Sequence, residues 1–406
     1  MNKTILILGL LLCTSYNTIA QSAGELQYSS SENAQSFNYK EELHDIASGT
    51  RVLGLGECTH GTVECTDVRS EIVKLLVQKY NYRHFILEGG YIPCKAINEY
   101  ISKGKGDLRA LVLHNIAWPF AIEEFANLLE WLKSYNMGKP ETEQVQFYGM
   151  DVTAHRILRT RYNEHRLYNK LSFDMDTTLL AKLETIKRDE KTRLKIYDEM
   201  LEQNSTEVIT TYDSIQRNNM IQSYKCGVTA GGEARKCREE AMYQFARYII
   251  DRIPAGEKAV IWAHNDHLSK KYSGRPSVGE MLHKHYGDGY RVIGFGFEGG
   301  NFLANTNENG KTVMHTYTAV HYPGTIEDQL KDKNNGLLGI NIGKNREHEL
   351  VDKKQMINNF GAEYNMVSAG KKNFYKEHLR LSASFDYFFV IKEMHPPTRI
   401  KLTKGE

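Results

Sequence analysis

The chain has 406 residues, of which 25% are charged and 41% hydrophobic, so it is long enough to bury a large core and its composition is that of a folded protein. Its 52 basic and 50 acidic residues give a net charge of +2. Because no long block of one sign is present, the sequence does not favour a nucleic-acid partner.

Residues 1–20 are expected to be a secretory signal peptide. Lys3 supplies the positive start, residues 5–12 the short apolar run, and Ala20 ends a small-residue cleavage site. A lipoprotein processed at Cys13 is the weaker alternative, because the bulky Leu12 precedes it. The apolar run is too short to span a bilayer, and no later segment is a candidate span. We therefore expect an exported protein, periplasmic or secreted, with no integral membrane segment after removal of the signal.

Short apolar runs alternate with helical patterns along the rest of the chain. Apolar residues spaced at i, i+4, i+7 and i+8 from Val68 predict a helix over 67–80, with Thr66 as its N-cap. Similar spacing recurs from Ile122 to Leu132. The expected strands are 51–55, 84–87, 145–149, 259–263, 291–297 and 387–391. This order predicts the α/β fold class, with a mainly parallel central sheet flanked by helices.

From about 155 to 252 the pattern changes to consecutive charged, helix-forming stretches, at 177–190, 192–203 and 235–253. This length is too great for one crossover, so we expect a long helical insertion that acts as a cap over the active-site edge of a single domain spanning 21–406. Cys226 and Cys237 flank a glycine-rich stretch and are the pair best placed to form a disulfide. A chain of this size does not need a disulfide to fold, so that pairing stays open.

Several well-known sites are absent from the sequence. It contains no G-x-S-x-G, no H-E-x-x-H and no G-x-x-x-x-G-K-[ST], which removes the usual support for serine α/β-hydrolase, zincin and P-loop chemistry. A G-x-G-x-x-G occurs at Gly294, Gly296 and Gly299, but no helical pattern follows it. We therefore do not expect dinucleotide binding.

Ionisable residues follow the expected strands at the points where the strands end: Glu57, His60, Glu88, Asp151, His264 and His267. The carboxyl ends of parallel strands meet at one edge of a sheet, where open α/β folds bind ligands, so we expect these side chains to line one pocket. Arg69 lies early in the helix after His60 and is expected to face the same edge. Any one of them alone is typical of a solvated loop, whereas the set predicts an active site.

The loop after the first of these strands has two further features. Gly56 and Gly61 bracket its ionisable residues and are expected to permit a sharp turn and leave room for a ligand. Cys58 and Cys65 lie close by in sequence, but no adjacent base is specified, so we expect structural thiols rather than nucleophiles.

At these residues the sequence resembles the erythromycin esterase family. The matching elements are Gly56-Glu57-x-x-His60-Gly61, Arg69, Glu88, Phe147-Tyr148-Gly149-x-Asp151, Trp262-Ala263-His264-Asn265-x-His267, Ile293-Gly294 and Phe385-Asp386. The resemblance implies a small-molecule partner and no cofactor: the enzyme would hydrolyse the lactone ester of a macrolide without a covalent acyl-enzyme, which would confer macrolide resistance.

The resemblance also implies roles for the site residues. His60 would be the general base that activates water, and Glu57 or Glu88 would orient it or set the charge of the site. His264, His267 and Arg69 would polarise the carbonyl and stabilise the oxyanion.

Two other functions remain open from the sequence. A metal-assisted hydrolase is one, because His264 and His267 with His60 and a glutamate offer ligands that zinc accepts. An exported hydrolase or binding protein of the same fold, acting on an envelope polysaccharide or another ester, is the second. The sequence gives no indication of the oligomeric state.

Overall fold

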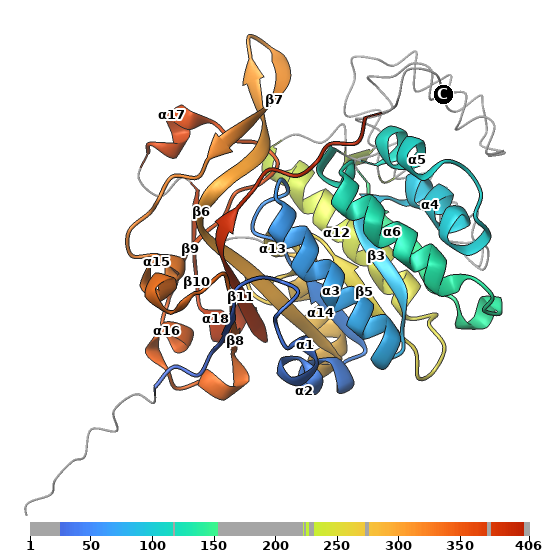
Figure 1. The fold of residues 1–406 in the computed structure, drawn as a ribbon, viewed down its shortest axis with the longest axis horizontal. Helices are drawn as coiled ribbons and strands as arrows, with labels where there is room; N and C mark the ends of the chain where they lie inside the picture. Colours follow the sequence, from blue (N-terminus) through green and yellow to red (C-terminus); the bar gives the residue numbers. More distant parts are fainter. Residues whose placement is uncertain are drawn as a thin grey trace, which may run out of the picture.

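A computed structural model describes residues 25–116, 118–152, 222, 225–226, 231–272, 276–371 and 375–401. Its centre is a nine-stranded sheet with the order β1-β8-β11-β6-β2-β5-β3-β4, in which β7 pairs with β6 outside this path (Figure 1). The strands are β1 (Ser29–Ser31), β2 (Val52–Leu55), β3 (Tyr82–Gly90), β4 (Gln146–Asp151), β5 (Lys258–Trp262), β6 (Tyr290–Glu308), β7 (Lys311–Thr318), β8 (Leu337–Asn341) and β11 (Tyr387–Met394). A separate antiparallel pair joins β9 (Gln355–Asn358) to β10 (Lys376–Leu379).

The central strands β11, β6, β2, β5, β3 and β4 run parallel to their neighbours. At one edge β8 is antiparallel to β11, and β1 is antiparallel to β8. The mainly parallel sheet is therefore confirmed. Each expected run of residues lies on a strand of this sheet, but β6 continues to Glu308 and pairs antiparallel with β7. Apart from the buried Phe302, Leu303 and Ala304, this extension is half-exposed or exposed, so it lacks the continuous apolar run of a buried strand.

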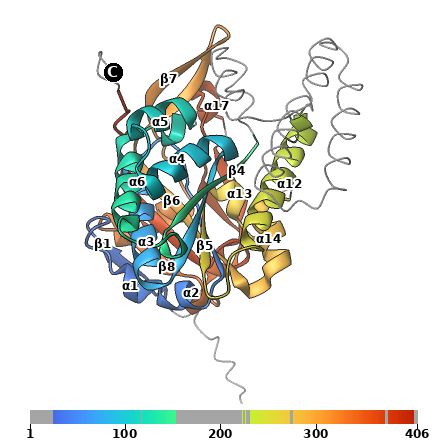
Figure 2. The same ribbon diagram turned by 90° about the vertical axis from the view of Figure 1, so that its right-hand side faces the viewer.

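Helices cover both faces of the sheet (Figure 2). They are α1 (Tyr39–Glu42), α2 (His44–Ser48), α3 (Val63–Lys79), α4 (Tyr91–Lys103), α5 (Leu108–Asn115), α6 (Glu123–Asn136), α12 (Gly231–Ile250), α13 (Asn265–Leu268), α14 (Val278–Tyr286), α15 (Ile326–Leu330), α16 (Glu349–Asp352), α17 (Met366–Ala369) and α18 (Leu381–Ser384). The apolar residues of α3, α4 and α6 join one core on one face, and those of α12 and α14 join a second core on the opposite face. The flanked sheet agrees with the expected architecture.

The expected start of α3 is wrong. The helix begins at Val63, its N-cap is Thr62, and Thr66 lies inside the helix, where its hydroxyl donates to the Thr62 carbonyl at 3.1 Å. The first turn is fixed by a distant segment, because the Val63 N–H donates to the His395 carbonyl at 3.0 Å. A long-range contact of this kind leaves no local signal in the sequence.

Part of the expected helical insertion is described. The stretch 235–253 corresponds to α12, and the disulfide Cys226–Cys237 is formed, with its Cα atoms 5.5 Å apart. The stretches 177–190 and 192–203 lie outside the described residues, as does the expected signal peptide at 1–20. Across the described parts of the chain, every helix is too short or too polar to cross a membrane.

The glycines of the G-x-G-x-x-G run have a packing role. They lie inside β6 rather than at the start of a helix. A Cβ at Gly294 would lie 2.6 Å from the Phe385 ring, and one at Gly296 would lie 2.5 Å from the Glu327 carboxylate. The absence of side chains therefore lets α15 and the segment before β11 approach the strand.

Candidate active site

The strand order brings the predicted residues to one edge of the sheet. Leu55 at the end of β2 pairs with Trp262 at the end of β5, and Leu87 of β3 pairs with Trp262 from the other side. The segments that follow these strands therefore lie side by side. The Asn265 N–H, at the start of α13, donates to the Glu57 carbonyl at 3.0 Å and joins two of these segments.

Two glycines determine the path of the loop after β2. A Cβ at Gly56 would lie 2.1 Å from the Asn265 amide oxygen, and one at Gly61 would lie 1.9 Å from the Leu303 carbonyl oxygen. Gly61 also accepts a hydrogen bond from the Leu303 N–H at 2.9 Å. The sequence suggested that Gly61 leaves room for a ligand, but the backbone of β6 fills the space beside it.

Glu57 joins His60 and Arg69. One carboxylate oxygen contacts His60 Nδ1, and the other accepts from Arg69 Nη2. Glu57 is buried; burial alone would raise its pKa, but the charges of Arg69 and His60 outweigh burial and leave the pKa below its ordinary value. A carboxylate on Nδ1 fixes the tautomer of the imidazole and leaves Nε2 for proton transfer. In the part of the chain that the structure describes, no residue bonds to His60 Nε2.

Arg69, which pairs with Glu57, is almost fully buried. Its Nε donates to the Cys65 carbonyl at 3.1 Å, and its guanidinium carbon lies 3.8 Å from the centre of the Trp262 ring. Nη1 is buried without a partner among the described residues. A buried cation with an unused donor beside an imidazole is suited to stabilising developing negative charge.

His264 lies next to His60, with the two ring centres 5.1 Å apart. Its Nε2 lies 3.0 Å from the Phe360 carbonyl oxygen and donates to it. Its Nδ1 accepts a hydrogen bond from the Asp266 backbone N–H at 3.3 Å and lies 3.6 Å from the Asp266 carboxylate. Burial alone would lower the pKa of His264, but nearby carboxylates, foremost Asp266, raise it. These carboxylates therefore stabilise any positive charge that the ring acquires beside His60.

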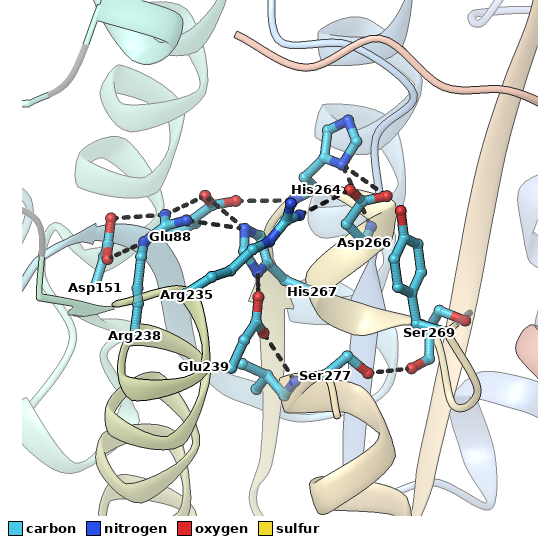
Figure 3. Close-up of polar contacts among 12 residues, drawn as sticks. Glu88, Asp151, Arg235, Arg238, Glu239, His264, Asp266, His267, Ser269 and Ser277 are labelled. Atoms are coloured by element: carbon cyan, nitrogen blue, oxygen red, sulfur yellow. Dashed lines mark hydrogen bonds and ion pairs between the residues drawn. The ribbon is translucent and has the colours of Figure 1, made fainter. Parts of the chain in front are cut away.

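Glu88 is held by a second network rather than by His60 (Figure 3). One oxygen accepts from Arg238 at 2.7 Å and from His267 Nε2 at 3.2 Å, while the other accepts the His264 backbone N–H at 2.9 Å. Burial would raise the pKa of Glu88, but His267 and Arg238 hold it well below the ordinary value. Of the two glutamates proposed to orient His60, Glu57 makes the contact.

His267 uses both of its ring nitrogens in ion pairs. Nε2 faces Glu88, and Nδ1 lies 2.7 Å from Glu239. Burial would lower the pKa of His267, but the two carboxylates raise it to about 10. Since neither nitrogen is left for a substrate, the geometry makes His267 a support for Glu88 and does not favour the expected direct contact with the ester carbonyl.

The structure thus brings the predicted residues to one sheet edge, and their catalytic roles stay predictions. They are Glu57, His60, Arg69, Glu88, Asp151, His264 and His267. Sequence reasoning missed the residues that hold them, which are Arg238, Glu239, Asp266 and the Phe360 carbonyl. The helical spacing of Arg235, Arg238 and Glu239 was a usable signal for a polar helix face, whereas a backbone carbonyl gives none.

The metal-assisted alternative needs several donors that point to one position. His267 is taken up by two glutamates, and His264 Nε2 by the Phe360 carbonyl. Within the described ranges, no group of three or more His, Cys, Asp or Glu side chains is arranged to hold a metal ion. The donor geometry therefore does not favour this alternative.

Comparisons with known proteins place the chain in a family. The profile of the family described as erythromycin esterase matches residues 77–394. The chain is 27% identical to the type I erythromycin esterase of Escherichia coli over 29% of its own length, and this match covers only 27% of that enzyme. It is 23% identical to the type II erythromycin esterase of Escherichia coli over 62% of the chain and 70% of that enzyme.

Two solved structures show the same fold. One is a succinoglycan biosynthesis protein, with a TM-score of 0.69, 19% identity, and coverage of 93% of this chain and 96% of that one. The other is an erythromycin esterase mutant in its open conformation, with a TM-score of 0.65, 16% identity, and coverage of 93% and 100%.

Proposed function

The chain belongs to the erythromycin esterase family, and from this premise we propose that it is a hydrolase that opens the lactone ester of a macrolide by adding water. The observation that carries the proposal is the Glu57–His60 pair, in which the carboxylate occupies Nδ1 and Nε2 has no hydrogen-bond partner among the described residues. This is the arrangement that a general base requires.

In the proposed reaction, His60 Nε2 takes a proton from a water molecule as its oxygen forms a bond to the ester carbonyl carbon. Glu57 holds the Nδ1–H and stabilises the imidazolium that forms. A positioned base contributes roughly 10²- to 10⁴-fold in rate. Because water is the nucleophile, the reaction passes through no acyl-enzyme.

Negative charge then develops on the former carbonyl oxygen. Arg69 shares Glu57 with His60, and its buried Nη1 has no partner among the described residues, while the ring of His264 lies beside that of His60. Both are fixed before the reaction begins, so they stabilise the oxyanion without reorganisation. When the intermediate collapses, the bond to the ring oxygen breaks, and the His60 imidazolium returns its proton to that oxygen. The product is a linear hydroxy acid.

We also propose that the protein is exported and that it confers macrolide resistance by destroying the drug. The signal-like residues 1–20 support the location, and the family supports the activity. Growth in the presence of a macrolide, with and without the gene, tests the resistance. Fractionation of cells, with detection of the protein by antibody, tests the location.

The experiment for the activity is to incubate the purified protein with macrolides of different ring sizes and to follow their masses. We expect a product heavier by one water, formed equally well after exhaustive chelation of metal ions. Activity that chelation abolishes and a metal ion restores would contradict the water-and-histidine mechanism. Hydrolysis confined to other esters would reject the macrolide, and no hydrolysis of any ester would reject the function.

A further inference from the structure

One face of α12 is complementary to the candidate active site. Arg235, Arg238 and Glu239 lie at positions i, i+3 and i+4, which share one side of a helix. Figure 3 shows all three pointing toward the ends of the strands. Arg235 pairs with Asp266 at 3.3 Å, while the other two bind the network around Glu88.

Arg238 makes the largest number of strong contacts in this face. Its Nε lies 2.9 Å from one oxygen of Asp151, and its Nη2 lies 3.0 Å from the other, so the guanidinium binds this carboxylate in a bidentate manner. The same Nη2 donates to Glu88 at 2.7 Å. The planar fork of an arginine fits two carboxylates at fixed angles, which an ammonium group does not reproduce.

Glu88 connects Arg238 to His264 through one further hydrogen bond. The second oxygen of Glu88 accepts the backbone N–H of His264 at 2.9 Å, and His264 is the N-cap of α13 beside His60. Arg238 also lies between the carboxylates of Glu88 and Asp151 and offsets part of their negative charge. Without it, Glu88 would keep its contact with His267 but would lose its 2.7 Å bond to the guanidinium and would be repelled by Asp151, which weakens its hold on the His264 amide.

We propose that Arg238 is a positioning residue for ester hydrolysis: through Glu88 it fixes the place of His264 relative to His60. The inference rests on the proposed function and adds to it a residue contributed by α12. A displacement of about 1 Å in such a site costs on the order of 10²-fold in rate. Binding of the substrate is expected to change little, because the contacts of Arg238 in the described residues are with Asp151, Glu88 and His267, and not with His60 or His264.

The first test compares Arg238→Ala and Arg238→Lys with the wild type. We expect Arg238→Ala to lower kcat by about 10²-fold, with little change in KM. Added guanidinium at millimolar concentration, which is far below denaturing concentrations, should restore part of the lost kcat. Arg238→Lys keeps the positive charge but loses the planar guanidinium, so its kcat should lie between those of the wild type and Arg238→Ala. Arg247→Ala, on the same helix, removes an exposed pair with Asp251 and is the matched control with unchanged kcat.

The second test does not depend on activity. Hydrogen exchange of the His264 amide reports whether Glu88 still accepts its bond, and we expect faster exchange in Arg238→Ala and Arg238→Lys than in the wild type or in Arg247→Ala. Wild-type kcat and wild-type exchange in Arg238→Lys would overturn the proposal. Faster exchange in a protein that hydrolyses no ester would retain the positioning role and reject only the proposed function.

Discussion

Replacing Glu327 by glutamine should remove the contribution of one buried carboxyl group to the pH dependence of stability. Glu327 is fully buried on α15, and one of its oxygens accepts the Asn358 N–H at 3.0 Å. Burial raises the pKa of Glu327 from 4.5 to about 8. The side chain is therefore neutral in the folded protein at neutral pH, whereas it is ionised in the unfolded chain.

The sign of the effect follows from this difference. A raised pKa in the folded state gives stability that is fully present below pH 4.5 and is lost as the pH rises through about 8. At about 1.4 kcal/mol for each unit between the two pKa values, the total loss is about 5 kcal/mol, with roughly 3 to 4 kcal/mol of it between pH 5 and pH 8. Glutamine at position 327 has no proton to lose, so the variant should be spared this loss.

Urea unfolding at pH 5, 7 and 9 measures the prediction. We expect Glu327→Gln and the wild type to differ little at pH 5, and the variant to become progressively more stable than the wild type above pH 7. The exposed Glu347→Gln serves as the control and should follow the wild type at every pH. Parallel curves for Glu327→Gln and the wild type would refute the assignment of a neutral buried carboxyl group.

Other substitutions test packing and the covalent link. Gly61→Ala should destabilise the fold by about 3 kcal/mol or more, because its Cβ would lie 1.9 Å from the Leu303 carbonyl oxygen. Gly232→Ala lies in open space on a helix and should stabilise the fold by up to about 1 kcal/mol. Thermal unfolding compares the two variants, and equal effects would contradict the close packing at Gly61. Replacing both Cys226 and Cys237 by serine should lower the free energy of unfolding by up to about 3 kcal/mol, since the disulfide closes a loop with a sequence separation of 11. Unfolding in urea measures the loss, and an unchanged midpoint would count against the disulfide.

Much of the fold could be predicted because buried parallel strands leave continuous apolar runs, such as residues 259–262 of β5, that stand out from the helices between them. Features set by distant contacts could not be predicted. The start of α3 depends on the His395 carbonyl, and the extension of β6 depends on β7, so neither has a local apolar pattern.

The candidate site likewise contains some contacts that the sequence indicates and others that it does not. Glu57 and His60 are only three residues apart, so the sequence already placed them close together, although it left Glu88 as an alternative partner of His60. Arg238 reaches Glu88 across 150 residues and lies on a helix whose charges are typical of a solvated face. The carbonyl of Phe360, which holds His264, belongs to the backbone and is independent of the side chain that the sequence specifies.

The most direct test of the account is the kcat of His60→Asn on an ester that the wild type hydrolyses. The asparagine amide keeps a donor for Glu57 but lacks the second nitrogen that would accept a proton from water. We predict a loss of roughly 10²- to 10⁴-fold, with an unchanged unfolding midpoint. A folded His60→Asn protein with kcat within tenfold of the wild type would contradict the claim that His60 is the base.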